Sequence, residues 1–199
     1  MPPIKRKKDI YRVGAGRGDI KQKLAELVTA ADPEPEITAL LGLPRRPVIK
    51  ALLAELMAGD EKVKGRLVAA VGRVAAAMAD ENLDAARDLM RRQIWNLNED
   101  SGGCPLGTPE AMAEIMANHD VMAREFAHVL VSFITPGGLH LNNERLMRGA
   151  VWGIGRLAQK HPGLVADAAP LLARMMDGPD HELRDLAATA LERLGREAR

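Results

Sequence analysis

The side chains best suited to chemistry gather in one short stretch of the chain, from Trp95 to Glu114. Polar and acidic residues crowd the expected end of a helix just after Trp95, where the helix macrodipole disfavours negative charge. Residues that oppose local stability often mark a functional site. The candidate binding residues in this stretch are Trp95, Asn96, Asn98, Glu99, Asp100, Ser101, Gly102, Gly103, Glu110 and Glu114.

A glycine-rich loop and the start of a second helix complete the stretch. The segment 101–103 gives the backbone freedom to adopt unusual dihedral angles. Thr108 is the expected N-cap of the next helix, whose free N–H groups can hold an anion. Glu110 and Glu114 are four residues apart, so they share one face of that helix.

Three kinds of chemistry suit these residues. Two carboxylates can act as a general acid and base. A peptide or helix can bind to the loop and the neighbouring groove, which is the interpretation that needs the fewest assumptions. A metal site would draw on Glu99, Asp100, Glu110, Glu114 and His119. The stretch also fits a plain turn between structural repeats, in which Asn, Asp and Ser side chains satisfy the loop backbone.

Other prominent residues fit structural roles. Trp95 and Trp152 occupy equivalent positions in two similar helices, and core packing is expected of both. Core filling is also expected of five methionines, Met90, Met112, Met116, Met122 and Met147. The chain has a single cysteine, which excludes an intramolecular disulfide and a four-cysteine zinc site.

Helices must position these residues, because nearly every segment after Asp19 has the apolar periodicity of an α-helix. Apolar residues recur at helical spacing, and proline or glycine separates the helices. No segment alternates apolar and polar residues for long enough to form a sheet, so the predicted class is all-α. The expected helices are Asp19–Ala30, a short one after Pro35, Pro47–Met57, a long one capped by Asp60, Leu83–Leu97, one opening at Thr108, Asp120–Ile134, Asn143–Lys160, Pro162–Met176 and Pro179–Arg196.

Several of these helices resemble one another. The segments 89–97 and 146–154 share Leu, Met, Arg and Trp at equal spacing, and an arginine recurs after an apolar ridge at Arg73, Arg156 and Arg193. Recurrent amphipathic helices cannot bury their apolar faces alone, so they stack into a solenoid. The small residues expected to allow close helix approach are Ala69, Ala70, Gly72, Gly149, Gly153 and Gly155.

The arginine-hydrophobic-alanine pattern and the helix-pair spacing resemble HEAT or armadillo-type repeats over residues 44–199. More narrowly, the segments 95–103 (WNLNEDSGG) and 109–115 (PEAMAEI) resemble an uncharacterised HEAT-like family found in sulfate-reducing bacteria. In that family a second tryptophan is expected near Leu106, but this chain has no tryptophan there. The resemblance implies a right-handed α-α superhelix and no established reaction.

Charge divides the chain into two parts. The net charge is +1, but residues 1–23 carry a net charge of +6 and the remainder carries −5. We therefore expect a basic N-terminal arm over residues 1–18 and a single helical repeat domain over residues 19–199. The acidic body and the 3% aromatic content argue against a nucleic-acid groove. No apolar run reaches the roughly 18 residues of a membrane span, and no apolar signal-peptide core follows the basic start, so a cytoplasmic protein is expected.

These observations predict a protein-interaction scaffold rather than an enzyme. Its binding surface would be the irregular loop and helix start around residues 95–114, its partner a protein or peptide, and neither a cofactor nor a metal is expected. Two alternatives stay open: a carboxylate-based enzyme or metal-binding protein that uses the same segment, and nucleic-acid binding through the basic arm at Lys5, Arg6, Lys7 and Lys8. The sequence leaves the oligomeric state open.

Overall fold

The computed structural model describes residues 17–58, 60–98 and 106–196, and these residues form ten α-helices, two 3-10 segments and no strand. The all-α prediction is confirmed. The 3-10 segments are η2 (Pro162–Leu164) and η3 (Ala166–Ala168). The α-helices are α1 (Arg17–Thr29), α2 (Glu34–Leu40), α3 (Arg45–Met57), α4 (Glu61–Glu81), α5 (Leu83–Asn98), α6 (Thr108–Ala117), α7 (Asp120–Ser132), α8 (Glu144–Ala158), α9 (Ala169–Met175) and α10 (His181–Arg196). Residues 1–16 of the expected arm lie outside the described residues, and its last two residues, Arg17 and Gly18, begin α1.

Two helices begin where the sequence predicts, because a side chain caps each of them. The Asp60 carboxylate accepts a hydrogen bond from the Lys62 backbone N–H at 2.9 Å, just before α4. Asn143 Oδ1 accepts hydrogen bonds from the backbone N–H groups of Arg145 and Leu146 at 3.0 and 3.2 Å, just before α8. Each cap satisfies donors that a helix start leaves without a partner.

The predicted N-cap at Thr108 is wrong. Thr108 is the first residue of α6 and is buried, and the cap position belongs to Gly107, whose φ is 76°. Glycine adopts this left-handed conformation without the strain that a Cβ atom adds. The helix therefore begins after a backbone turn and not after a side-chain cap.

The single helix predicted over Pro162–Met176 is also wrong, because the segment is divided into η2, η3 and α9. Pro170 has no N–H group with which to continue a helix from the preceding turn, and it is tolerated only in the first turn of a new helix. Helix α9 accordingly begins at Ala169, directly before that proline.

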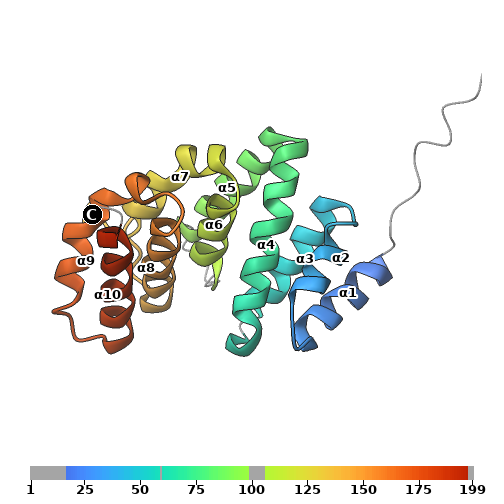
Figure 1. Cartoon of the computed structure of the whole chain (residues 1–199), viewed down its shortest axis with the longest axis horizontal. Coiled ribbons are helices and arrows are strands. Elements are labelled where there is room, and N and C mark those ends of the chain that lie inside the picture. The colour runs from blue at the N-terminus through green and yellow to red at the C-terminus, as the bar shows by residue number, and fades with distance from the viewer. Residues whose placement is uncertain (1–16, 59, 99–105, 197–199) are drawn as a thin grey trace, which may run out of the picture.

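The helices stack in an elongated array that runs from α1 at one end to α9 and α10 at the other (Figure 1). The most extensive contacts between repeats join α4 to α6, α6 to α8 and α8 to α10. We call these four helices the central row. Helices α3, α5, α7 and α9 pack mainly on helices of the central row, and we call them the flanking helices.

Glycines in the central row let its helices approach closely, as the sequence predicts. A Cβ atom at Gly153 would lie 2.8 Å from Ala113 Cβ, and one at Gly72 would lie 2.9 Å from the Glu114 carbonyl carbon. Real Cβ atoms essentially never come within 3.0 Å of such neighbours. The spacing of the central row therefore depends on the absence of side chains at these positions.

One hydrophobic cluster runs from Ile20 in α1 to Ala190 in α10. It contains all five methionines that were expected in the core. Trp152 is half-buried against this cluster, but Trp95 is 66% exposed, so the prediction of core packing for Trp95 is wrong. The two rings differ because α8 packs between α6 and α10, whereas α5 is a flanking helix with central neighbours on one side.

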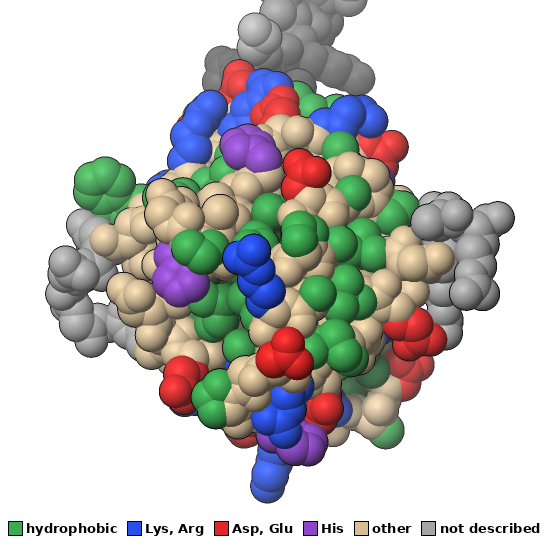
Figure 2. Space-filling model, turned by 90° about the vertical axis from the view of Figure 1, so that its left-hand side faces the viewer, with side chains coloured by type: hydrophobic (Ala, Val, Ile, Leu, Met, Phe, Trp, Pro, Cys, Tyr) green, Lys and Arg blue, Asp and Glu red, His purple; other side chains and the backbone are tan. Residues whose placement is uncertain are grey.

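The C-terminal end of the array is seen face-on in Figure 2. Apolar side chains show in the middle of this end, and charged side chains lie mostly around them. A cavity of about 490 Å³ between η2 and α10 has Leu191 and Leu194 in its wall. Such side chains are accessible because a terminal repeat has no neighbour to cover it.

Candidate functional site

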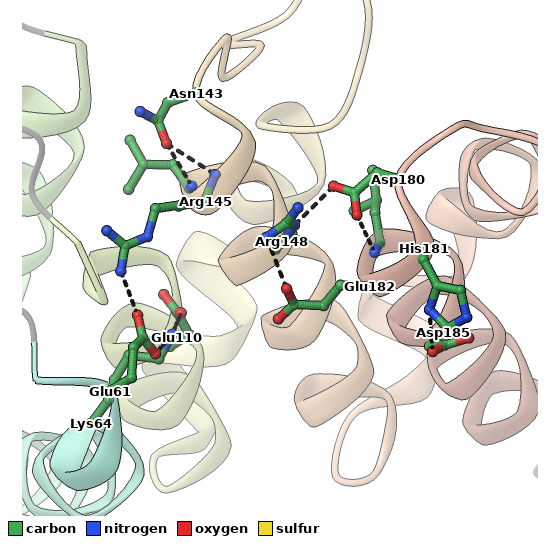
Figure 3. Close-up of polar contacts among 12 residues, drawn as sticks. Glu61, Lys64, Glu110, Asn143, Arg145, Arg148, Asp180, His181, Glu182 and Asp185 are labelled. Carbon is green, nitrogen blue, oxygen red and sulfur yellow. Dashed lines mark hydrogen bonds and ion pairs between the residues drawn. The ribbon is translucent and has the colours of Figure 1, made fainter.

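The central row carries a pocket of about 150 Å³ in its face. We call it the central pocket, and Figure 3 shows the polar contacts around it. All four central helices contribute to its wall. The polar and aromatic side chains in the wall are Lys64 from α4, Glu110 from α6, Arg148 and Trp152 from α8, and Glu182 from α10.

Glu110 is the buried acid of the central pocket, with only 7% of its side chain exposed. Its Oε1 lies 3.0 Å from Lys64 Nζ, but its buried Oε2 has no hydrogen-bond partner in the described part of the chain. Gly149 of α8 faces the carboxylate, and a side chain there would collide with it. A buried polar atom without a partner costs about 1–3 kcal/mol, so this oxygen marks the pocket as a candidate site.

Lys64 links two acids, because its Nζ also lies 3.1 Å from a carboxylate oxygen of Glu61. Burial lowers the pKa of Lys64, but the attraction of Glu110 and Glu61 outweighs burial and raises that pKa above 10.5. The hydrogen bond from Arg145, 2.7 Å long, is the main cause of a lowered pKa at Glu61. Arg145 therefore joins the N-terminal ends of α8 and α4 (Figure 3).

Arg148 joins α8 to α10 in the same way. Its Nε donates to Asp180 Oδ2 and its Nη1 donates to Glu182 Oε2, both at 2.8 Å. The hydrogen bond from Arg148 is the main reason that the pKa of Asp180 lies below 3.8, and the backbone N–H of Leu183 lowers it further. Trp152, one turn after Arg148, brings a half-buried ring to the same pocket.

We expect Asp180→Asn to remove a pH-dependent part of the stability. Because folding lowers the pKa of Asp180, its ion pair stabilises the fold fully above the unfolded-state pKa of about 3.9 and progressively less as the pH falls through the folded-state pKa. Asparagine can still accept the Leu183 N–H, so the substitution isolates the charge. The melting temperature of the variant should lie below that of the parent chain at pH 7, and the difference should shrink as the pH falls below about 3.9. A constant difference over this range would contradict the ion-pair account.

Glu114 lies one turn beyond Glu110 and has its own cation. Arg156 of α8 donates to both carboxylate oxygens of Glu114, with Nε at 2.6 Å and Nη2 at 3.1 Å. The Glu114 and Arg156 side chains are 12% and 20% exposed. Arg73, the equivalent arginine of α4, pairs with Glu34 of α2. At these two positions the recurring arginine therefore ties a central helix to an earlier helix.

The predicted binding residues divide between two surfaces. Glu110 and Glu114 share one face of α6, as predicted, but each pairs with a different cation. Trp95, Asn96 and Asn98 are exposed on α5, where Asn96 lines a groove between α3 and α5. Five further predicted residues lie outside the described residues, namely Glu99, Asp100, Ser101, Gly102 and Gly103.

Sequence reasoning missed three charged residues of the central pocket, Lys64, Arg148 and Glu182. They come from three helices that are distant along the chain, and each resembles an ordinary charge on a helix surface. Of the three, only Arg148 stands out in the sequence, because it lies in the segment 146–154 that resembles 89–97.

No group of three or more His, Cys, Asp or Glu side chains is placed to hold a metal ion within residues 17–58, 60–98 and 106–196. His119, a member of the alternative metal set, caps α7 instead, and its Nδ1 accepts the Met122 N–H at 3.3 Å. The same ranges contain no helix that is long and apolar enough to cross a membrane.

Residues 145–194, which span most of α8 to α10, match the HEAT-like repeat family. An engineered protein solved by the Northeast Structural Genomics Consortium has a TM-score of 0.50 to this chain and is 21% identical, over 92% of this chain and 87% of that one. A designed armadillo repeat protein in complex with the peptide (KR)4 also has a TM-score of 0.50 and is 18% identical, over 91% of this chain and 87% of that one. The fold is a HEAT/armadillo-type solenoid. This right-handed α-α superhelix confirms the predicted fold class, while a search of the curated proteins found no match.

Proposed function

We propose that this solenoid is a protein-interaction scaffold that binds an extended basic peptide across the central pocket. The observation that carries the proposal is the buried Glu110 carboxylate, whose Oε2 lacks a partner in a pocket built by all four central helices. A repeat fold by itself does not define a function, so the proposal rests on this site.

The charges around the central pocket favour a basic partner. The network in Figure 3 that borders the central pocket holds three Lys or Arg side chains and four carboxylates, a net charge of −1. The cations are Lys64, Arg145 and Arg148, and the carboxylates are Glu61, Glu110, Asp180 and Glu182. Because every one of these cations is already paired, the surplus negative charge can attract a lysine or arginine of a partner.

Trp152 and Glu182 supply complementary contacts at the central pocket. The half-buried ring of Trp152 can attract a cation through its π face, an interaction worth about 0.5–2 kcal/mol. The Glu182 side chain is 65% exposed and can therefore meet an incoming charge. The designed armadillo repeat protein of similar fold holds (KR)4, a peptide of alternating basic residues, and this example supports the proposal.

Of the predicted binding segment 95–114, the part at the start of α6 contributes to the surface around the central pocket. Glu110 belongs to the central pocket, and Glu114 follows it on the same face of α6. We further propose that residues 1–18 form a basic arm on a single domain over 19–199 and that the protein is cytoplasmic. Kinship with the HEAT-like family of sulfate-reducing bacteria is part of the same proposal.

Calorimetric titration with an octapeptide of alternating lysine and arginine tests the proposal. We expect the peptide to bind the parent chain and to bind about tenfold more weakly to Trp152→Ala and to Glu182→Gln, a loss of about 1.4 kcal/mol each. The attraction should weaken as salt is raised, because the carboxylates at the pocket mouth are exposed.

Glu55→Gln is the matched control, because it removes the same charge from an exposed position on α3 that does not line the central pocket. Its affinity should stay within about twofold of the parent value. If the peptide fails to bind the parent chain, or if Glu55→Gln weakens binding as much as Glu182→Gln, the central pocket is not the peptide site.

A further inference from the structure

A groove of about 420 Å³ lies between the flanking helices α3 and α5, above α4. We call it the flanking groove. It forms because α3 and α5 each pack more extensively on α4 than on each other. Its apolar floor consists of Ile49, Leu53, Met57, Met78 and Leu89. Met57 is 53% exposed, so part of this floor is open to a partner.

Three cations surround the apolar floor, Arg46 and Lys50 on α3 and Arg92 on α5, and all three are exposed. No Asp or Glu lines the flanking groove. Arg45 and Arg91, the sequence neighbours of two of these cations, pair with carboxylates. In contrast, the described residues provide no ion-pair partner for the three cations of the groove.

The basic surface continues on the other side of α3. A cavity of about 850 Å³ between α1 and α3 shares Arg46 and Lys50 with the flanking groove and adds Lys21. This cavity also has no Asp or Glu in its wall. Arg46 and Lys50 of α3 therefore border two cavities whose walls contain no carboxylate, although residues 24–199 carry a net charge of −5.

Gln93 adds a polar group to the floor of the flanking groove. Only 6% of this residue is exposed. Its amide can donate to and accept from a polar group of a partner that covers the floor.

We propose that the flanking groove docks an acidic amphipathic helix of a protein partner. The apolar face of that helix would cover the floor between α3 and α5, and its carboxylates would meet Arg46, Lys50 and Arg92. This site is separate from the central pocket and binds the opposite charge, so its test does not depend on the basic-peptide proposal.

The cations and the apolar floor of the flanking groove together determine which kind of partner fits it. The protein's own arm carries Lys5, Arg6, Lys7 and Lys8, and these charges would repel the cations of the groove. Nucleic acid would satisfy the cations but would leave the apolar floor uncovered. An amphipathic acidic helix satisfies both features.

Fluorescence anisotropy with a labelled synthetic helix tests the proposal. The probe is an 18-residue peptide with leucines at helical spacing on one face and glutamates on the other. Two companion peptides complete the test, one with lysine in place of every glutamate and one of the same composition in scrambled order. Only the amphipathic acidic peptide should bind the full chain, and raised salt should weaken its binding.

Charge reversals locate the binding site. Arg46→Glu, Lys50→Glu and Arg92→Glu should each weaken binding at least about fivefold, and Met57→Asp should do the same by placing a charge on the apolar floor. Arg124→Glu is the matched control, because Arg124 is exposed on α7 outside the groove and should leave the affinity within about twofold.

Three results would overturn the proposal. The first is equal binding of the acidic and scrambled peptides, which would reduce the attraction to charge alone. The second is equal weakening by Arg124→Glu and Arg46→Glu. The third is sedimentation of the parent chain as a dimer that Arg46→Glu dissociates, because a second copy of the chain would then fill the groove. Circular dichroism of each variant verifies that the altered affinity comes from a folded protein.

Discussion

Replacing Glu114 with alanine is expected to lower the free energy of unfolding by about 2–4 kcal/mol. Breaking a buried ion pair by removing one partner costs about 3–5 kcal/mol, because the remaining charge stays buried without compensation. The Glu114 and Arg156 side chains are 12% and 20% exposed, so solvent screens part of this loss. Urea denaturation of the parent chain and the variant measures the difference.

The equivalent pair two repeats earlier is the matched control. Arg73 pairs with Glu34 at 3.1 Å, but these side chains are 39% and 60% exposed. Glu34→Ala should therefore cost less than about 1 kcal/mol. Adding Arg156→Met to Glu114→Ala should recover part of the larger loss, because no buried charge is then left without a partner. Equal costs for Glu114→Ala and Glu34→Ala would contradict a role for burial.

Gly107→Ala is expected to destabilise the fold by about 2–5 kcal/mol. The left-handed backbone at φ 76° costs a residue with a Cβ about 1–2 kcal/mol. A Cβ atom there would also lie 2.7 to 3.0 Å from side-chain carbons of Leu56, and overpacking of this kind costs about 1–3 kcal/mol. Thermal and urea denaturation measure the combined loss.

Gly137→Ala separates the two causes. Gly137 has a φ of 79°, and a Cβ atom built there meets nothing within 4 Å. Its substitution should therefore cost only the backbone strain of about 1–2 kcal/mol. If the two alanine variants are equally stable, the contact between Gly107 and Leu56 does not hold α3 against the start of α6.

Local sequence signals were enough to predict most of the helices, because capping and periodicity act within a few residues. Asp60 and Asn143 cap their helices as expected. Gly107 and Thr108 show where such signals fail, since both residue types favour a helix start and tertiary packing against Leu56 decides between them. Pro170 indicates a break in the helix, but the apolar pattern around it favours one continuous helix, and the prediction followed that pattern.

The candidate site was predictable only in part. The four-residue spacing of Glu110 and Glu114 places both on one face of α6, and the structure confirms this. Their partners Lys64 and Arg156 come from other helices, 46 and 42 residues away in the chain, so local spacing cannot reveal them. Trp95 was expected in the core because its segment resembles that of Trp152, but it stands three and four residues after Arg92 and Arg91 on the exposed face of α5.

The sequence alone also does not reveal how the charges divide between the central pocket and the flanking groove. The net charge of +1 suggests little electrostatic character beyond the N-terminal arm. The fold nevertheless gathers a surplus of carboxylates around the central pocket. Around the flanking groove it places three cations that have no ion-pair partner among the described residues. This separation arises because the central and flanking helices present their exposed faces to different sides of the array.

Hydrogen–deuterium exchange with and without the peptide of alternating lysine and arginine tests whether the central pocket binds a basic peptide. We expect slower exchange in segments 61–68, 108–114, 145–152 and 181–186, which surround the central pocket, and unchanged exchange in α3 and α5. Protection of α3 and α5 instead, or no protection at a peptide concentration that saturates binding, would contradict peptide binding at the central pocket.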